Sequence, residues 1–208
     1  MTNRSEPAPP VCAVYDEPKH RFRLRNQWTN VYEIELPRDE QTLFHRHNED
    51  TVYFVVADAE VRESFPDKPA IITTASAGGT LCRAHKDDPL VHQVRNVGQG
   101  TVHMLGAEAL ARPPASAATN PDLPAHTLKT ESGRFRVFDV SVGEEAVTLH
   151  YDVFGLLVTF VECTLGSASR GPNGGISVGI RPGGFMWLEP PAEVTLPAAF
   201  RGIFAQWI

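Results

Sequence analysis

Short runs of alternating apolar and polar residues occur along most of the chain, and Gly, Pro, Asn or Asp bounds each run. Val, Tyr, Phe and Thr dominate these runs, which is typical of β-strands. The strands predicted in the first half are Val31–Leu36, Thr51–Val56, Thr80–Arg83, Leu90–Arg95 and Val102–Leu105. Those predicted in the second half are Phe135–Ser141, Leu156–Cys163, Phe185–Leu188 and Gly202–Trp207. Few stretches also suit a helix, so the pattern predicts an all-β protein.

The two halves of the chain match each other in the same order. Val31–Ile34 recurs as Val137–Val140 at an offset of 106 residues, and Thr51–Val56 matches Leu156–Val161 at an offset of 105. Several matches that stay in register indicate a tandem duplication. Short strands avoid long open edges by closing into barrels or by stacking two sheets. We therefore expect two tandem antiparallel barrels or sandwiches.

Proline-rich segments predict the domain boundaries, because proline cannot continue a helix or a central strand. The first ten residues are polar and include three prolines, and a second such stretch follows the first set of strands. The predicted organisation is an N-terminal arm at 1–20, a first barrel at 21–111, a linker at 112–127 and a second barrel at 128–208.

Composition and charge narrow the classes of partner. The chain has 208 residues, of which 42% are hydrophobic and 21% charged, as in ordinary folded proteins. A net charge of −6 gives no basic field for nucleic acid or for an anionic membrane. Three distant cysteines and the lack of a targeting or membrane-spanning segment predict a cytoplasmic protein. A small-molecule ligand is the expected partner.

Histidines supply the candidate chemistry. In an extended segment, His45 and His47 point to the same face, a spacing at which two imidazoles can share one metal ion. His92 lies on a later predicted strand, four residues before Asn96, which begins a turn. The alternative is that these histidines stack against one another in a barrel without binding a metal.

These residues resemble the cupin superfamily. Its first motif places Glu shortly after His-x-His, and its second places Asn four residues after a His that follows glycines. His45-Arg46-His47 and His92-x-x-x-Asn96 match these motifs in order, with Gly78-Gly79 near the start of the second. The resemblance covers residues 28–207 and implies a bicupin, an all-β chain of two tandem jelly-roll barrels.

The resemblance also implies a ligand set of His45, His47 and His92 for one divalent transition metal, which could be Fe, Zn, Ni or Mn. The family's Glu falls on Thr51 or Val52, so the fourth ligand would be Asp50 in a shortened loop, or else Glu49. A shell of three histidines is the remaining alternative.

Other candidate residues are ranked by their position in the predicted strands. Tyr53 and His103 are expected to line the substrate site, whereas His85 and His20 lie in polar stretches and are expected to be solvated. The second half has only His150 where the first has its His-x-His motif. The second barrel is therefore predicted to be degenerate and structural.

The leading functional hypothesis is a metal-dependent enzyme of the dioxygenase, isomerase or lyase type that acts on a small organic molecule. No catalytic residue is identified. The alternatives are a non-catalytic module that binds or senses a small molecule, and a storage-type or scaffold bicupin. A homodimer is expected, because cupin-like barrels commonly associate through sheet edges and because the C-terminus is strongly apolar.

Overall fold

Strands and turns make up nearly all of the chain that the computed structural model describes, residues 10–114, 123–167 and 176–208. The helical element among these residues is a single 3₁₀ turn, η1 (Val14–Asp16). The prediction of an all-β fold is confirmed. No helix long and apolar enough to cross a membrane occurs in the described ranges. Residues 1–9 of the predicted arm and 115–122 of the predicted linker lie outside the described residues.

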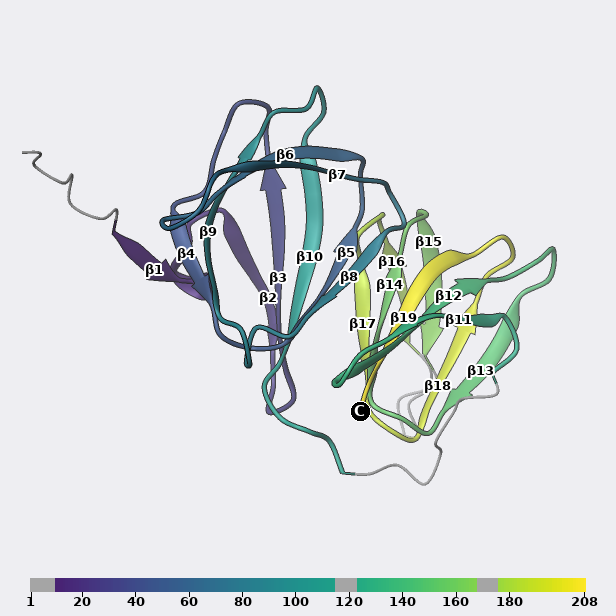
Figure 1. Ribbon diagram of the computed structural model, residues 1–208. Helices are drawn as coiled ribbons and strands as arrows, with labels where there is room; N and C mark the ends of the chain where they lie inside the picture. The colour runs from purple at the N-terminus through teal and green to yellow at the C-terminus, as the bar shows by residue number, and fades with distance from the viewer. Residues whose placement is uncertain (1–9, 115–122, 168–175) are drawn as a thin grey trace, which may run out of the picture. The chain divides into compact units, whose positions relative to one another are not determined.

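The first of two units consists of the described residues up to 25, 30–79 and 83–108. Its strands lie in two five-stranded sheets (Figure 1). One sheet has the order β1 (Val11–Ala13), β4 (Phe44–His47), β9 (Leu90–Asn96), β6 (Ala59–Ser64) and β7 (Ile71–Ala75). The other has the order β2 (His20–Arg25), β3 (Thr29–Leu36), β10 (Val102–Ala109), β5 (Thr51–Val55) and β8 (Thr80–Arg83).

The second unit consists of residues 26–29, 80–82 and the described residues from 109 on. Its five-stranded sheet has the order β11 (His126–Glu131), β12 (Phe135–Ser141), β19 (Arg201–Trp207), β14 (Gly155–Thr159) and β17 (Phe185–Leu188). Its four-stranded sheet has the order β13 (Val147–Tyr151), β18 (Ala192–Leu196), β15 (Cys163–Ser167) and β16 (Ile176–Ile180). Both units are jelly rolls, but their sheets stay open in the described residues and do not close into barrels.

The strand order of the first unit recurs in the second, with β1 as the extra strand. The register recurs as well. The β2–β3 pairing shifts between Phe22 and Leu24, and the β11–β12 pairing shifts between Leu128 and Thr130, each 106 residues later. An irregularity repeated at the same place supports the predicted duplication.

The predicted offset of 105 is wrong for the strand that begins at Thr51. The Val55 N–H donates to the Gly79 carbonyl, and the Thr159 N–H donates to the Gly184 carbonyl in the same way. Val55 is thus equivalent to Thr159, an offset of 104, which is two residues less than the offset of 106 between the β2–β3 and β11–β12 pairings. A change in loop length alters the offset between equivalent residues of the two halves, whereas the paired strands keep the same register.

Two predicted boundaries are also changed. Val11–Ala13 pairs in parallel with Phe44–Arg46, and Val14 is buried, so ordered structure begins well before residue 21. The predicted strand Leu156–Cys163 ends at Thr159, and a separate strand begins at Cys163. The sequence pattern did not predict β2 and β6, because charged side chains alternate along both strands.

The apolar C-terminus is docked, as expected for a final strand. β19 pairs with both β12 and β14, and Trp207 is buried. A buried terminus leaves no apolar patch there, so it no longer supports the homodimer, which stays a prediction.

Candidate metal centre

Strand pairing brings the three predicted histidines together in the first unit. His45 and His47 alternate on β4 and are buried, and His45 lies directly opposite His92 on β9. One nitrogen from each ring lies within 4.8 Å of one nitrogen from each of the others. The Nε2 atoms of His47 and His92 are 3.2 Å apart. The three rings form the histidine trio.

The other nitrogen of each ring has its own partner. His45 Nδ1 lies 2.9 Å from the Leu43 carbonyl oxygen, and His92 Nδ1 lies 3.2 Å from Glu63 Oε2. His47 Nδ1 lies 3.2 Å from the Tyr53 hydroxyl. A carbonyl and a carboxylate can only accept, so His45 and His92 donate from Nδ1 and keep a lone pair on Nε2. Such partners orient the histidine ligands of metals.

The environment keeps His45 and His47 neutral. Burial, together with the neighbouring histidines His20 and His92, lowers the pKa of His45 to about 3. Burial also lowers the pKa of His47 well below its usual value. The hydrogen bond from His92 lowers the pKa of Glu63, which is therefore a carboxylate. Neutral imidazoles are the form that binds metal.

Two further histidines belong to the same cluster, contrary to the prediction that they are solvated. The ring of His20 is 4.7 Å from that of His45, and its Nδ1 donates to the Val14 carbonyl. The ring of His85 stacks on His47 at 5.0 Å. Both are buried. The alternating pattern of β2 could have indicated an inward His20, but nothing in the polar stretch around His85 indicates burial.

The two acids predicted to complete the ligand set are not in the group formed by the trio. Asp50 Oδ1 accepts a hydrogen bond from the Lys86 backbone N–H at 3.0 Å. Glu49 Oε2 lies 3.7 Å from the Lys86 ammonium. Their loop directs these side chains toward the segment that carries Lys86. Glu63, which the motif comparison missed, is the acid that contacts the trio.

The two predicted substrate-lining residues lie in different places. Tyr53 is in the cluster, where its hydroxyl contacts His47 and His85. His103 is not. A Cβ on Gly106 would meet the ring of Tyr32, which stacks on His20, so Gly106 faces the cluster. Three residues away on the same strand, His103 points to the opposite face.

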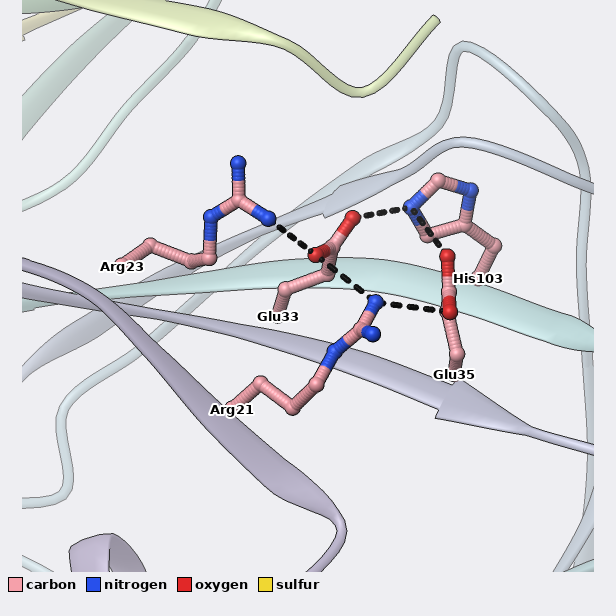
Figure 2. Close-up of polar contacts among 5 residues, drawn as sticks. All are labelled: Arg21, Arg23, Glu33, Glu35 and His103. Atoms are coloured by element: carbon pink, nitrogen blue, oxygen red, sulfur yellow. Dashed lines mark hydrogen bonds and ion pairs between the residues drawn. The ribbon is translucent and has the colours of Figure 1, made fainter.

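His103 forms an ionic network on that opposite face. Figure 2 shows it with Glu33, Glu35 and two arginines. Its Nε2 is 2.8 Å from Glu33 Oε1, and Arg23 is 2.7 Å from Glu33 Oε2. Although burial raises the pKa of Glu33, the His103 hydrogen bond and Arg23 lower it overall. The guanidinium groups already neutralise these carboxylates, so the network is a poor cation site.

In the second unit, other residues occupy the positions of the histidine trio. Tyr151 pairs with Ala192 as His45 pairs with His92, and Val153 is the residue equivalent to His47. His92 therefore corresponds to Ala192. Tyr151 and Val153 are buried in the apolar core. His150 is exposed and lies 3.3 Å from Glu193.

Comparisons with known proteins reveal the fold. No protein-family model matches the sequence, and no curated protein matches it either. Protein YlbA from Escherichia coli is similar in structure over 100% of this chain and 87% of its own, with a TM-score of 0.61 and 10% identity.

Two further solved structures are similar to this chain, with comparable TM-scores and sequence identities. The salicylate 1,2-dioxygenase from Pseudoaminobacter salicylatoxidans, in a mutant form, matches with a TM-score of 0.54 and 12% identity over 87% of this chain and 71% of its own. A cupin 2 conserved barrel domain protein from Leptotrichia buccalis matches with a TM-score of 0.52 and 10% identity over 90% and 87%.

Proposed function

The chain has the two-domain cupin fold, and we propose that its first unit binds one divalent transition metal and acts with it on a small organic molecule. The observation that carries this proposal is the convergence of nitrogens from His45, His47 and His92 within 4.8 Å. Neutral imidazoles suit Fe, Zn, Ni and Mn, and three ligands leave a position open for substrate.

The protonation of the rings fits a cation. His92 holds its proton on Nδ1 against the Glu63 carboxylate, so its Nε2 lone pair faces His47 Nε2 across 3.2 Å. A cation bound there would accept this lone pair together with that of a His47 ring protonated on Nδ1. The charge of Glu63 would also offset part of the charge of a metal dication.

A divalent metal at these nitrogens would polarise a substrate oxygen or, if it were iron, supply redox chemistry. The residues of the chain hold the three rings in place, and Phe65, 6.4 Å from the His92 ring, adds an apolar surface beside them. Dioxygenase, isomerase and lyase chemistry are all compatible with this arrangement. The structural likeness to a dioxygenase makes oxygenase chemistry the first to test.

Metal analysis of protein purified without an affinity tag tests the proposal. We expect about one equivalent of transition metal in the wild type and background levels in His47→Ala and His92→Ala. The exposed His150 provides the control, because His150→Ala should retain full metal content. Full retention in His92→Ala, with the fold intact by circular dichroism, would contradict the site.

The identity of the metal then directs the search for activity. Iron with an electron paramagnetic resonance signal that changes on addition of a candidate substrate would favour an oxygenase. Zinc would favour lyase or isomerase chemistry. Bound metal with ligand binding but no turnover across these classes would favour the non-catalytic binding module.

A further inference from the structure

The sheet that contains β4, β9, β6 and β7 carries the histidine trio on one face, the trio face, which is open on its β7 side. Glu63 contacts His92 and so lies on this face, and Ile71 lies directly opposite Glu63 in the β6–β7 pairing. Residues directly opposite each other in an antiparallel pair share a face. Ile71 is nevertheless 51% exposed, whereas the trio is buried. Solvent therefore reaches the trio face along β7.

Phe65 extends the trio face beside the histidines. The last β6–β9 pair joins Ser64 to Gln93, so the next residue after Ser64 lies beside His92. The ring centroids of Phe65 and His92 are 6.4 Å apart. The Lys68 ammonium lies 4.2 Å from the centroid of the Phe65 ring, and this contact holds its charge near the histidines. An apolar ring and a cation thus lie together beside the proposed metal site.

A second cation, Arg83, lies at the end of β8. β8 and β17 each directly follow the glycine whose carbonyl accepts the equivalent hydrogen bond, and they end at Arg83 and Leu188. Leu188 is buried in the core of its unit, so the equivalent position of Arg83 faces inward. The His92 hydrogen bond is the largest cause of the lowered pKa of Glu63, and the charge of Arg83 contributes to it. The guanidinium therefore acts on the trio face.

These two cations have no carboxylate partner among the described residues, whereas the two arginines of Figure 2 are paired with Glu33. Even Asp67, which is adjacent to Lys68 in the sequence and exposed, forms no ion pair with it there. The acid on the trio face, Glu63, already accepts hydrogen bonds from His92 and from the Thr73 hydroxyl. The exposed part of this face therefore offers positive charge that an anionic ligand can pair with.

We propose that Lys68 and Arg83 bind the carboxylate of a small substrate whose apolar body lies against Phe65 and Ile71. The substrate class is an organic acid with an aromatic or branched aliphatic body. Apolar walls with a few convergent polar groups are typical of small-molecule sites. The inference rests on the proposed function for the reaction at the metal, but the pairing of a carboxylate with the two cations does not require a metal.

Two variants and a matched control test the proposal. Lys68→Gln and Arg83→Gln each remove one positive charge from beside the trio. Arg62→Gln is the control, because Arg62 is exposed and, one residue before Glu63, points to the opposite face of β6. The probes are benzoate and isovalerate, each compared with its neutral amide. Chemical-shift titrations of ¹H–¹⁵N spectra measure their affinities for the metal-free protein and for the protein loaded with Zn²⁺.

We expect both carboxylates to bind the wild type and Arg62→Gln more tightly than their amides do. In Lys68→Gln and in Arg83→Gln, the carboxylates should bind about tenfold more weakly, as expected for the loss of one hydrogen bond between charged groups, and the amides should bind as before. Carboxylates that bind the wild type no more tightly than their amides would overturn the proposal. So would wild-type affinity for the carboxylates in either folded variant.

The two proposals can fail separately, because a metal ion also attracts carboxylates and the metal-free titration removes that contribution. A wild type that binds no Zn²⁺ but prefers carboxylates, with both variants weakened, would refute the metal site and support the carboxylate site. A wild type that binds Zn²⁺ but does not prefer carboxylates would refute the carboxylate site alone.

Discussion

Glu63 shows how one residue outside the recognisable motif affects the site. It is on β6, where its Oε2 accepts from His92 and its Oε1 accepts from the Thr73 hydroxyl on β7 at 2.9 Å. The second contact restrains the carboxylate, so that the His92 ring is held from behind. A carboxylate in this position also increases the electron density of the imidazole.

Replacing Glu63 should therefore weaken metal binding without removing any ligand. We expect Glu63→Ala to bind Zn²⁺ about 10- to 100-fold more weakly than the wild type in a chelator competition. Glu60→Ala is the control on the same strand, because Glu60 is exposed. Equal affinities in the two variants would show that Glu63 has no part in holding His92.

At the scale of the strand, β10 passes so close to β3 side chains that one position must be glycine. A Cβ at Gly106 would lie 2.4 Å from the ring of Tyr32. Tyr32 is buried and stacks on His20 at 4.8 Å, so it cannot move without disturbing the histidine cluster. The close approach of β10 thus fixes the position of the Tyr32 ring beside the histidine cluster.

Gly106→Ala should destabilise the fold by overpacking. We expect a loss of about 1–3 kcal/mol in the free energy of unfolding, measured by urea denaturation. Gly100→Ala should be nearly neutral, since nothing lies within 4 Å of a Cβ at Gly100. A Gly106→Ala protein as stable as the wild type would mean that Tyr32 can be displaced at little cost.

At the scale of the whole molecule, the duplication produced two copies of the fold that differ in chemistry. The residues equivalent to His45, His47 and His92 are Tyr151, Val153 and Ala192. His126, the second-unit equivalent of His20, remains, and its Nε2 lies 3.2 Å from the Tyr151 hydroxyl. A single histidine beside apolar residues does not supply the several ligands that a metal needs.

We therefore expect one tight metal site per chain. Titration of metal-free protein with Zn²⁺ should reach its equivalence point near one metal per chain, and His126→Ala should not change it. Two equivalent tight sites per chain, or loss of the tight site in His126→Ala, would show that the second unit has kept a function of its own.

The sequence by itself determined the fold class, the duplication and the identity of the histidine trio. Strand periodicity is local, so His45 and His47 had to share a face once the segment was extended. His92 followed from the order of the cupin motifs. The repeat offset was less secure, because each change in loop length alters it without affecting strand pairing.

Only the tertiary structure revealed the surroundings of the trio. The trio is contacted by three side chains from β2, β6 and the segment after β8, namely His20, Glu63 and His85. The spacing of these residues along the sequence does not predict such contacts. Tertiary structure also separated His103 from the site and turned Asp50 away from it. The reason is physical: the face of a residue follows from its own strand, but its neighbours depend on how distant strands pair in register.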